Sequence, residues 1–156
     1  MLVGPAALAI VTKQIFLFPS LGPTAVMLAH EPQHRSSRPY AVLVSHAAGL
    51  AAASVSVAIF GIAFAPSVFE THTVSPARAG AVLLALALAI FLEVALRAQH
   101  PPAAATTLLV ALGSFHPTPH DAFLIMGGVV AVLIVGEPLR RRVAEYEPHH
   151  VPPNSA

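Results

Sequence analysis

The sequence predicts an all-helical, polytopic membrane protein built from two inverted repeats, each containing a short half-helix broken by glycine and proline. Apolar residues make up 56% of the 156 positions and charged residues only 10%, whereas a typical soluble domain has about 25% charged residues. The apolar residues are gathered in long stretches bounded by proline and arginine, and a proline-containing short segment occurs once in each half. Water is therefore not the main solvent of this chain.

Three apolar stretches, at residues 39–65, 76–98 and 121–139, are long enough to cross a membrane. About 20 residues of helix span a hydrocarbon core of roughly 30 Å. In the third stretch we expect Asp121 to be the N-cap and the arginines at 140–142 to end the membrane span.

A fourth apolar stretch, at residues 2–18, is shorter and carries Lys13 and Gln14. We expect it to cross the membrane only if the helix tilts little. A signal sequence is the alternative, but no small-residue cleavage site follows the apolar part, so a membrane helix is favoured.

Two further segments, at residues 20–28 and 100–109, are too short and too broken to cross. Each has proline near its start, where the missing N–H costs nothing, followed by small and then apolar residues. We expect each to be a half-helix that begins inside the membrane, where backbone breaks are tolerated only against protein or a wet cavity.

A shift of 79 positions superimposes the two halves of the chain. The landmarks that coincide are Pro23 with Pro102, Gln14 with Glu93, and Gly49 with Gly128. Both halves then follow the order helix, broken helix, loop, helix. Coincidence among so many prolines and glycines is the alternative to a true repeat.

The distribution of basic residues predicts the orientation. Arginines occur within 35–38 and at 140–142, whereas the segments 66–75 and 114–120 contain no lysine or arginine. Because cytoplasmic loops are enriched in these residues, both termini are expected in the cytoplasm and the two repeats have opposite orientations. Arg78 lies on the wrong side, and we expect its side chain to snorkel to the interface.

Residues 1–142 therefore form the expected membrane domain, and residues 143–156 a polar cytoplasmic tail rich in proline and histidine. The predicted location is the cell membrane, as a multi-pass protein, which in a bacterium is the inner membrane. The absence of cysteine excludes disulfides, thiolate metal sites and a cysteine nucleophile. A net charge of +1 gives no reason to expect a nucleic-acid partner.

The sequence contains no phosphate-binding loop or nucleophile motif, so neither an enzyme nor a cofactor is expected. Nine histidines raise the question of a metal site. The pairs His116 and His120, and His149 and His150, lack the regular helical spacing of committed ligands, and we interpret them as surface histidines.

Three motifs carry a resemblance to a known family. Residues 99–106 read QHPPAAAT, residues 20–26 read SLGPTAV, and residues 45–49 read SHAAG. In this order, over about residues 1–140, they resemble the HPP family of integral membrane proteins, named for its His-Pro-Pro motif. The resemblance implies a small membrane protein, and nitrite transport is the activity of some photosynthetic members. Pro23 departs from the alanine usual in the family, and the leading helix is shorter than the family's.

The residues themselves are compatible with an anion site. A helix N-terminus carries about +0.5 of a charge and unpaired N–H groups. Proline at the first position is expected to leave free the amides of Thr24 and Ala25 in one repeat and of Ala103 and Ala104 in the other. The alternative is that these small residues only allow tight helix packing.

His100 is the first candidate side chain, as N-cap of the second half-helix, because histidine titrates near neutrality and can donate to an anion. A purely structural cap is the alternative. His46 lies about two turns into a long helix and either faces the same cavity or packs between helices. Glu93 would cost about 2.5 to 3.5 kcal/mol in lipid, so we expect it to pair with Arg97 or to relay protons.

The candidate substrate-binding residues are Ser20, Gly22, Pro23, Thr24, Ala25, His46, His100, Pro101, Pro102, Ala103, Ala104 and Thr106. Two functions follow. The first is a carrier or channel for a small inorganic anion, with nitrite as the candidate given by the resemblance. The second is a membrane sensor or assembly subunit that transports nothing. The expected partners are the lipid bilayer, the anion and, because so short a chain encloses little interior, further copies of itself.

Overall fold

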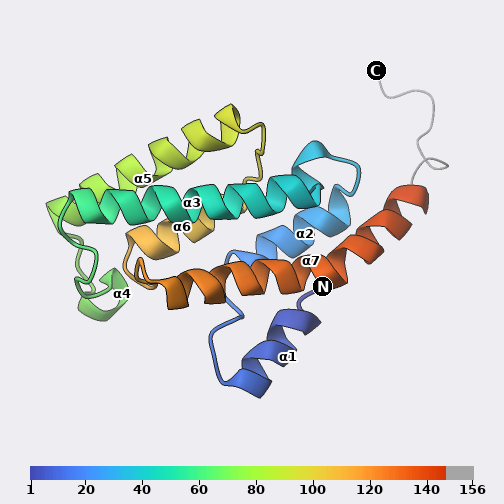
Figure 1. The fold of residues 1–156 in the computed structure, drawn as a ribbon, viewed down its shortest axis with the longest axis horizontal. Coiled ribbons are helices and arrows are strands. Elements are labelled where there is room, and N and C mark those ends of the chain that lie inside the picture. The colour runs from blue at the N-terminus through green and yellow to red at the C-terminus, as the bar shows by residue number, and fades with distance from the viewer. Residues whose placement is uncertain (147–156) are drawn as a thin grey trace.

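The computed structural model describes residues 1–146, and this part of the chain is helical (Figure 1). The elements in order are α1 (Val3–Thr12), α2 (Leu21–His30), the 3-10 helix η1 (Arg35–Ser37), α3 (Pro39–Ile59), α4 (Val68–Thr71), α5 (Pro76–Ala95), α6 (Ala103–Ala111) and α7 (Pro119–Tyr146). The histidine pair at 149 and 150 lies outside the described residues. Helix α7 continues beyond the expected domain boundary at 142.

Three helices, α3, α5 and α7, are long and apolar enough to cross a membrane. The prediction of a helix over residues 2–18 was wrong in extent. Helix α1 has only 10 residues, ends at Thr12 and is followed by Lys13 with a left-handed φ of 55°. Residues 13–20 contain no helix. At 1.5 Å per residue α1 covers about 15 Å, half of a bilayer core.

The helices form two groups around α3 and α7. Helices α5 and α6 pack on α3, helices α1 and α2 pack on α7, and α3 contacts α7. Small residues allow the closest approaches: a Cβ on Gly49 of α3 would overlap the Thr107 hydroxyl of α6, and a Cβ on Gly128 of α7 would lie 2.7 Å from the Phe16 carbonyl oxygen. Glycine at helix contacts is typical of membrane bundles.

The two short helices begin inside the molecule and run in opposite directions, α2 toward the end of α7 and α6 toward its start (Figure 1). Their 10 and 9 residues are each too few to cross a bilayer. Neither proline occupies the expected first helical position. Pro23 is the third residue of α2, and Pro102 is the N-cap of α6.

Two further expectations about charged residues were wrong. Asp121 is not the N-cap of α7, because the Thr118 hydroxyl accepts from the Asp121 amide at 3.1 Å, and the Asp121 carboxylate instead accepts from the backbone of His116 at 2.6 Å. Arg78 does not snorkel, since only 4% of it is exposed. Its guanidinium donates to three backbone carbonyls, those of Ala65, Pro66 and Ala111.

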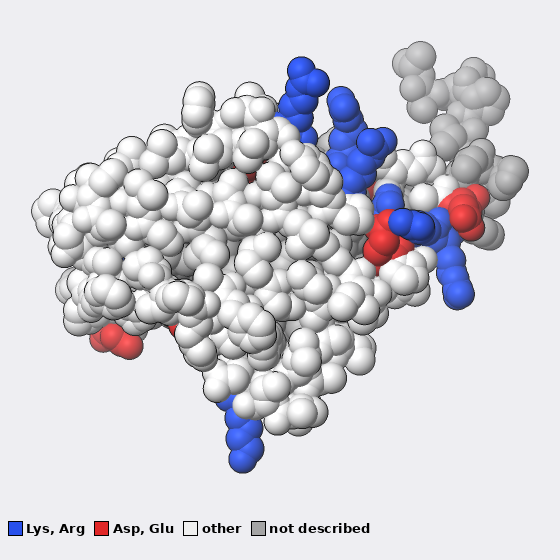
Figure 2. Space-filling model, in the orientation of Figure 1, with Lys and Arg blue, Asp and Glu red and all other residues white. Residues whose placement is uncertain are grey.

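Charge is distributed unevenly over the surface. Figure 2 shows most of the basic side chains at the end of the molecule where α7 ends, and a wide face with no charged atoms. Large apolar side chains of α5, such as Leu83, Ile90 and Phe91, are exposed on this helix. Such surfaces are suited to lipid or to another protein chain.

Candidate functional site

A cluster of polar side chains lies where α2 and α6 begin. It consists of Ser20, Thr24, His46, His100 and Thr106, all of them 0% exposed. Ser20 and Thr24 come from the start of α2, Thr106 from the first turn of α6, His100 from the segment before α6 and His46 from the middle of α3. We call these five residues the polar cluster.

The hydrogen bonds of the polar cluster form one continuous chain. The hydroxyls of Ser20 and Thr106 are 2.8 Å apart, and Thr106 Oγ1 is 2.7 Å from His46 Nδ1. Thr24 Oγ1 bridges the two histidines, at 3.3 Å from His46 Nε2 and 3.2 Å from His100 Nε2. His100 Nδ1 is 2.8 Å from the backbone oxygen of Ser36, which ends the chain.

The Ser36 carbonyl fixes the direction of this chain, because a carbonyl can only accept. His100 must therefore carry its proton on Nδ1, which leaves a lone pair on Nε2, and the nearest donor is the Thr24 hydroxyl. That hydroxyl has a single proton, so Thr24 must accept from His46 Nε2–H. His46 Nδ1 is then an acceptor for the Thr106 hydroxyl. With neutral histidines, this arrangement satisfies every imidazole nitrogen.

Thr24 could instead donate to the backbone oxygen of Ser20, which is 3.0 Å away. That choice would leave the buried lone pair of His100 Nε2 without a donor, at a cost of about 1 to 3 kcal/mol. The single hydroxyl proton of Thr24 thus has two competing acceptors, the Ser20 carbonyl and His100 Nε2.

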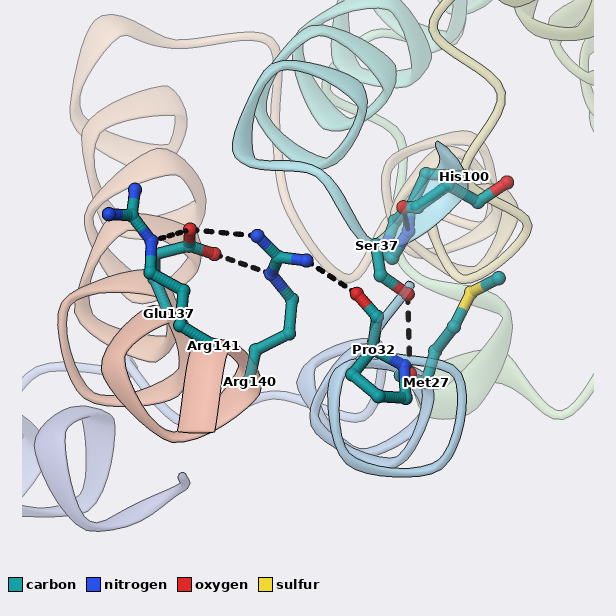
Figure 3. Close-up of polar contacts among 8 residues, drawn as sticks. Met27, Pro32, Ser37, His100, Glu137, Arg140 and Arg141 are labelled. Carbon is teal, nitrogen blue, oxygen red and sulfur yellow. Dashed lines mark hydrogen bonds and ion pairs between the residues drawn. The ribbon is translucent and has the colours of Figure 1, made fainter. Parts of the chain in front are cut away.

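The loop that carries Ser36 is held in place from both sides. The Ser37 hydroxyl donates to the Met27 carbonyl of α2 at 3.3 Å, and Arg140 of α7 donates to the Pro32 carbonyl. Figure 3 shows Arg140 reaching from α7 to this loop while its guanidinium is paired with Glu137, at 2.7 and 2.9 Å. The loop that carries the Ser36 carbonyl is therefore tied to α7 by a charge-assisted hydrogen bond.

A cavity of about 440 Å³ opens beside Ser36. Its lining residues are His34, Arg35, Ser36, Val94, Arg97 and Gln99. Ser36 thus lines the cavity, and its carbonyl accepts from His100 of the polar cluster. The guanidinium groups of Arg35 and Arg97 give this cavity a positive potential that attracts anions.

A buried aromatic pair includes a residue that lies close to Ser20 along the chain. Phe18, two residues before Ser20, packs edge to face against Phe115, which follows the C-terminal end of α6, with ring centroids 5.9 Å apart. Both rings are buried. Among the cavities described, the one at Ser36 reaches a residue that bonds to the polar cluster, whereas Phe18 and Phe115 line none.

Several predicted site residues lie elsewhere. Pro23, Pro101 and Pro102 line a groove of about 550 Å³ between α2 and α6, and Gly22 and Ala25 line a separate groove near the N-terminus. Ala104 is half-buried and Ala103 is buried against Gly49 of α3. None of these seven residues contributes a side chain to the polar cluster.

The expectation of free amides at the two helix starts was also wrong. Thr24 N–H donates to the Ser20 carbonyl at 3.4 Å, Ala103 N–H to the His100 carbonyl at 2.9 Å, and Ala104 N–H to the Pro101 carbonyl at 3.1 Å. His100 does not cap α6 with its side chain, because its ring turns away to Thr24 and Ser36. The chain before each helix folds into turns that already use these donors.

The expected pair of Glu93 with Arg97 is not formed, and no ion pair joins them in the described part of the chain. Helix α5 ends at Ala95, and Arg97 has a left-handed φ of 51°, which places its side chain in the cavity wall instead. His116 and His120 both approach Asp121, at 3.8 and 3.1 Å. Residues 1–146 contain no group of three or more potential metal ligands.

Sequence reasoning missed two contributors to the site. The Ser36 carbonyl carries no side-chain signal at all. Ser45, one residue before His46, donates to the Ala98 carbonyl and so ties α3 to the segment that carries His100. Its position in the SHAAG motif was the only available indication.

Comparison with known proteins gives one result. No curated protein and no solved structure is detectably similar to this chain. Residues 1–142 match the family described as "HPP, transmembrane region". This match covers every element of the fold up to the last turn of α7, and it includes all five residues of the polar cluster. The chain therefore belongs to the HPP family of transmembrane proteins.

Proposed function

We propose that this protein is a transporter for a small inorganic anion, with nitrite as the candidate substrate, and that the polar cluster is its substrate site. The observation that carries the proposal is that two short helices from opposite halves of the chain begin at the same buried cluster. Broken helices whose positive ends meet inside a membrane protein are the arrangement that secondary transporters use for anionic groups.

The packing of the helices supports two inverted repeats. Helix α5 packs on α3 as α1 packs on α7, and α6 packs on α3 as α2 packs on α7. Gly49 and Gly128, which a shift of 79 residues superimposes, make equivalent close contacts in the two halves, Gly49 with α6 and Gly128 with the chain entering α2. In each half the long helix that follows a half-helix therefore supports the half-helix of the other repeat.

The chemistry of the polar cluster suits a small planar anion. The backbone amides at the helix starts are already used, so the donors must come from side chains, namely the hydroxyls of Ser20, Thr24 and Thr106 and the two imidazoles. Hydroxyl rotors can turn toward an ion without moving the backbone. The aligned peptide dipoles of α2 and α6 still favour negative charge at this point.

Alternating access requires that one approach to the cluster be open while another is closed. The arginine-lined cavity reaches Ser36, whose carbonyl accepts from His100, and we expect the packed rings of Phe18 and Phe115 to close a second approach. The basic residues at the cavity end favour a cytoplasmic location for it, with both termini inside the cell. The exposed apolar face of α5 favours assembly into a homo-oligomer in the bilayer.

Anion uptake into proteoliposomes tests the proposal. Vesicles that contain the purified protein should take up nitrite faster than protein-free vesicles do. Thr106→Val, which removes a hydroxyl of the polar cluster, should reduce the rate strongly. Thr107→Val is the matched control, because Thr107 is equally buried in the same helix but bonds only to the Ala103 carbonyl of its own turn. No uptake above protein-free vesicles, or equal uptake by the two variants, would contradict the proposed site.

A further inference from the structure

The polar cluster holds no fixed positive charge. Its members are hydroxyl and imidazole side chains, and the hydrogen-bond pattern is satisfied with both histidines neutral. The nearest charged groups come from the surrounding elements. Arg35 and Arg97 line the cavity beyond Ser36, and Glu93 of α5 lies near the backbone amide of His100. Helices α2, α3 and α6 contribute only hydroxyl and imidazole groups to the cluster.

Hydroxyl donors and helix dipoles offset only part of the cost of burying an anion, and an opposite charge beside the anion lowers that cost further. Lysine and arginine are absent from the cluster, so the two histidines are the only groups in it that can become positive. The ring centroids of His46 and His100 are 5.5 Å apart. At this separation a single imidazolium is favoured over two, because like charges repel.

The hydrogen bonds also provide a way to link the anion and the proton. Thr24 has one hydroxyl proton and uses it for the lone pair of His100 Nε2. Thr106 likewise uses its proton for His46 Nδ1. When either hydroxyl turns to donate to an anion, it leaves an imidazole lone pair without a donor in a buried site. That lone pair is then the place where a proton from water binds.

We infer that the polar cluster takes up one proton with each anion, so that the protein is an electroneutral proton–anion cotransporter, with His46 and His100 sharing the proton. This inference rests on the proposed function and names its coupling ion. In the balanced step, a hydronium ion loses a proton, an N–H bond forms at His100 Nε2 or His46 Nδ1, and the imidazolium faces the anion. On release the N–H bond breaks, and the proton returns to water with the departing anion. No electrons are transferred.

The chain has a preferred direction because the Ser36 carbonyl accepts at one end only. Donors point from Ser20 through Thr106, His46, Thr24 and His100 toward Ser36. An excess proton that enters at Ser20 can be handed on from group to group until it reaches His100. The Ser36 carbonyl can only accept and does not pass the proton on, so the proton leaves the histidines together with the departing anion.

Proton uptake on binding can be measured directly by titration calorimetry of nitrite into the purified protein in detergent, repeated in buffers of different ionisation enthalpy. The slope of the binding enthalpy against the buffer enthalpy gives the number of protons bound, and we expect about one per anion. A slope of zero with measurable binding overturns the inference and leaves the proposed function standing. Absence of binding and of nitrite uptake would overturn the proposed function itself.

Two variants locate the proton. His100→Asn keeps an N–H near the position of Nδ1 for the Ser36 carbonyl but removes Nε2, and His46→Asn keeps an acceptor near Nδ1 but removes Nε2. We expect the slope to fall in each variant and to vanish when the two are combined. His30→Asn, at the exposed end of α2, is the control and should leave the slope unchanged. A full slope in the double variant would overturn the assignment to these histidines.

Transport supplies an independent readout. With a pH indicator inside the vesicles and the membrane potential clamped by potassium and valinomycin, nitrite entry should acidify the interior. The uptake rate, after subtraction of protein-free vesicles, should not depend on the clamped potential. Uptake that follows the potential and carries no protons would show that the anion moves alone.

Discussion

Replacing Thr24 by valine should lower the stability of the protein although it hardly changes the shape of the side chain. Valine has nearly the volume of threonine, so Thr24→Val removes a hydroxyl and adds a methyl group. The hydroxyl bridges His46 Nε2 and His100 Nε2, at 3.3 and 3.2 Å, in a place that is 0% exposed. Its removal leaves one buried donor and one buried acceptor without partners.

The magnitude follows from these two groups. An unsatisfied buried polar group costs about 1 to 3 kcal/mol in soluble proteins. Interhelical hydrogen bonds in membranes average about 0.6 kcal/mol and reach about 1.7, because the unfolded helices also find partners in the bilayer. Two lost bonds should therefore lower the free energy of unfolding by about 1 to 3.5 kcal/mol.

The matched control is Thr107→Val. Thr107 is also 0% exposed, but its hydroxyl donates only to the Ala103 carbonyl of its own helix, at 3.3 Å. That carbonyl keeps its backbone partner in the variant, so the expected loss is below about 1 kcal/mol. Reversible unfolding by sodium dodecyl sulfate in mixed micelles, followed by circular dichroism, measures both values.

An equal loss in the two variants would refute the reasoning, because it would mean that the bridge between the histidines contributes nothing beyond the substitution itself. A second readout is independent of stability. Nitrogen-15 chemical shifts report imidazole tautomers, and in the wild-type protein at neutral pH they should show the proton on Nε2 of His46 and on Nδ1 of His100. The opposite tautomer at His100 would contradict the direction derived from Ser36.

Three other predictions concern the frame that holds the site. Gly128→Ala should lower the free energy of unfolding by about 1 to 3 kcal/mol, because a Cβ there meets a backbone carbonyl at 2.7 Å. Gly22→Ala is the control, and it should leave the free energy of unfolding unchanged or raise it, because a Cβ there meets nothing within 4 Å. Arg78→Lys should cost more than about 1.5 kcal/mol in the same assay, since one ammonium cannot reach three carbonyls, and a loss within error would show that those bonds are dispensable. A reporter fused after Arg142 should read cytoplasmic and one inserted within residues 114–120 exterior, and reversed results would remove the inverted-repeat interpretation.

The sequence was sufficient for the class of protein and for the location of its long helices. Composition and the length of the apolar stretches predicted membrane helices near α3, α5 and α7, and the structure contains all three. These properties depend on local hydrophobicity and helix length, which can be read along the chain. The family resemblance, carried by three short motifs, was confirmed over residues 1–142.

Helix ends and charged side chains were predicted less well. Asp121, Arg78 and the pair of Glu93 with Arg97 were each assigned a local partner or a route to the interface. In the structure Asp121 contacts its sequence neighbours His116, Thr118 and His120. Arg78, in contrast, bonds to carbonyls 13 and 33 residues away. A local pattern does not show which remote carbonyl a long side chain will reach.

For the candidate site too, the sequence predicted one part and the tertiary structure determined the rest. The sequence placed Ser20, Thr24, His46, His100 and Thr106 among twelve candidate substrate-binding residues, which were chosen from the starts of the two half-helices and from the three motifs. Only the tertiary structure decided that these five side chains meet, that Thr24 stands between the two histidines, and that the Ser36 carbonyl sets the direction of the chain. The physical reason is that a hydrogen-bond chain depends on atoms brought together from four separate segments, and its polarity on a backbone oxygen that every residue possesses.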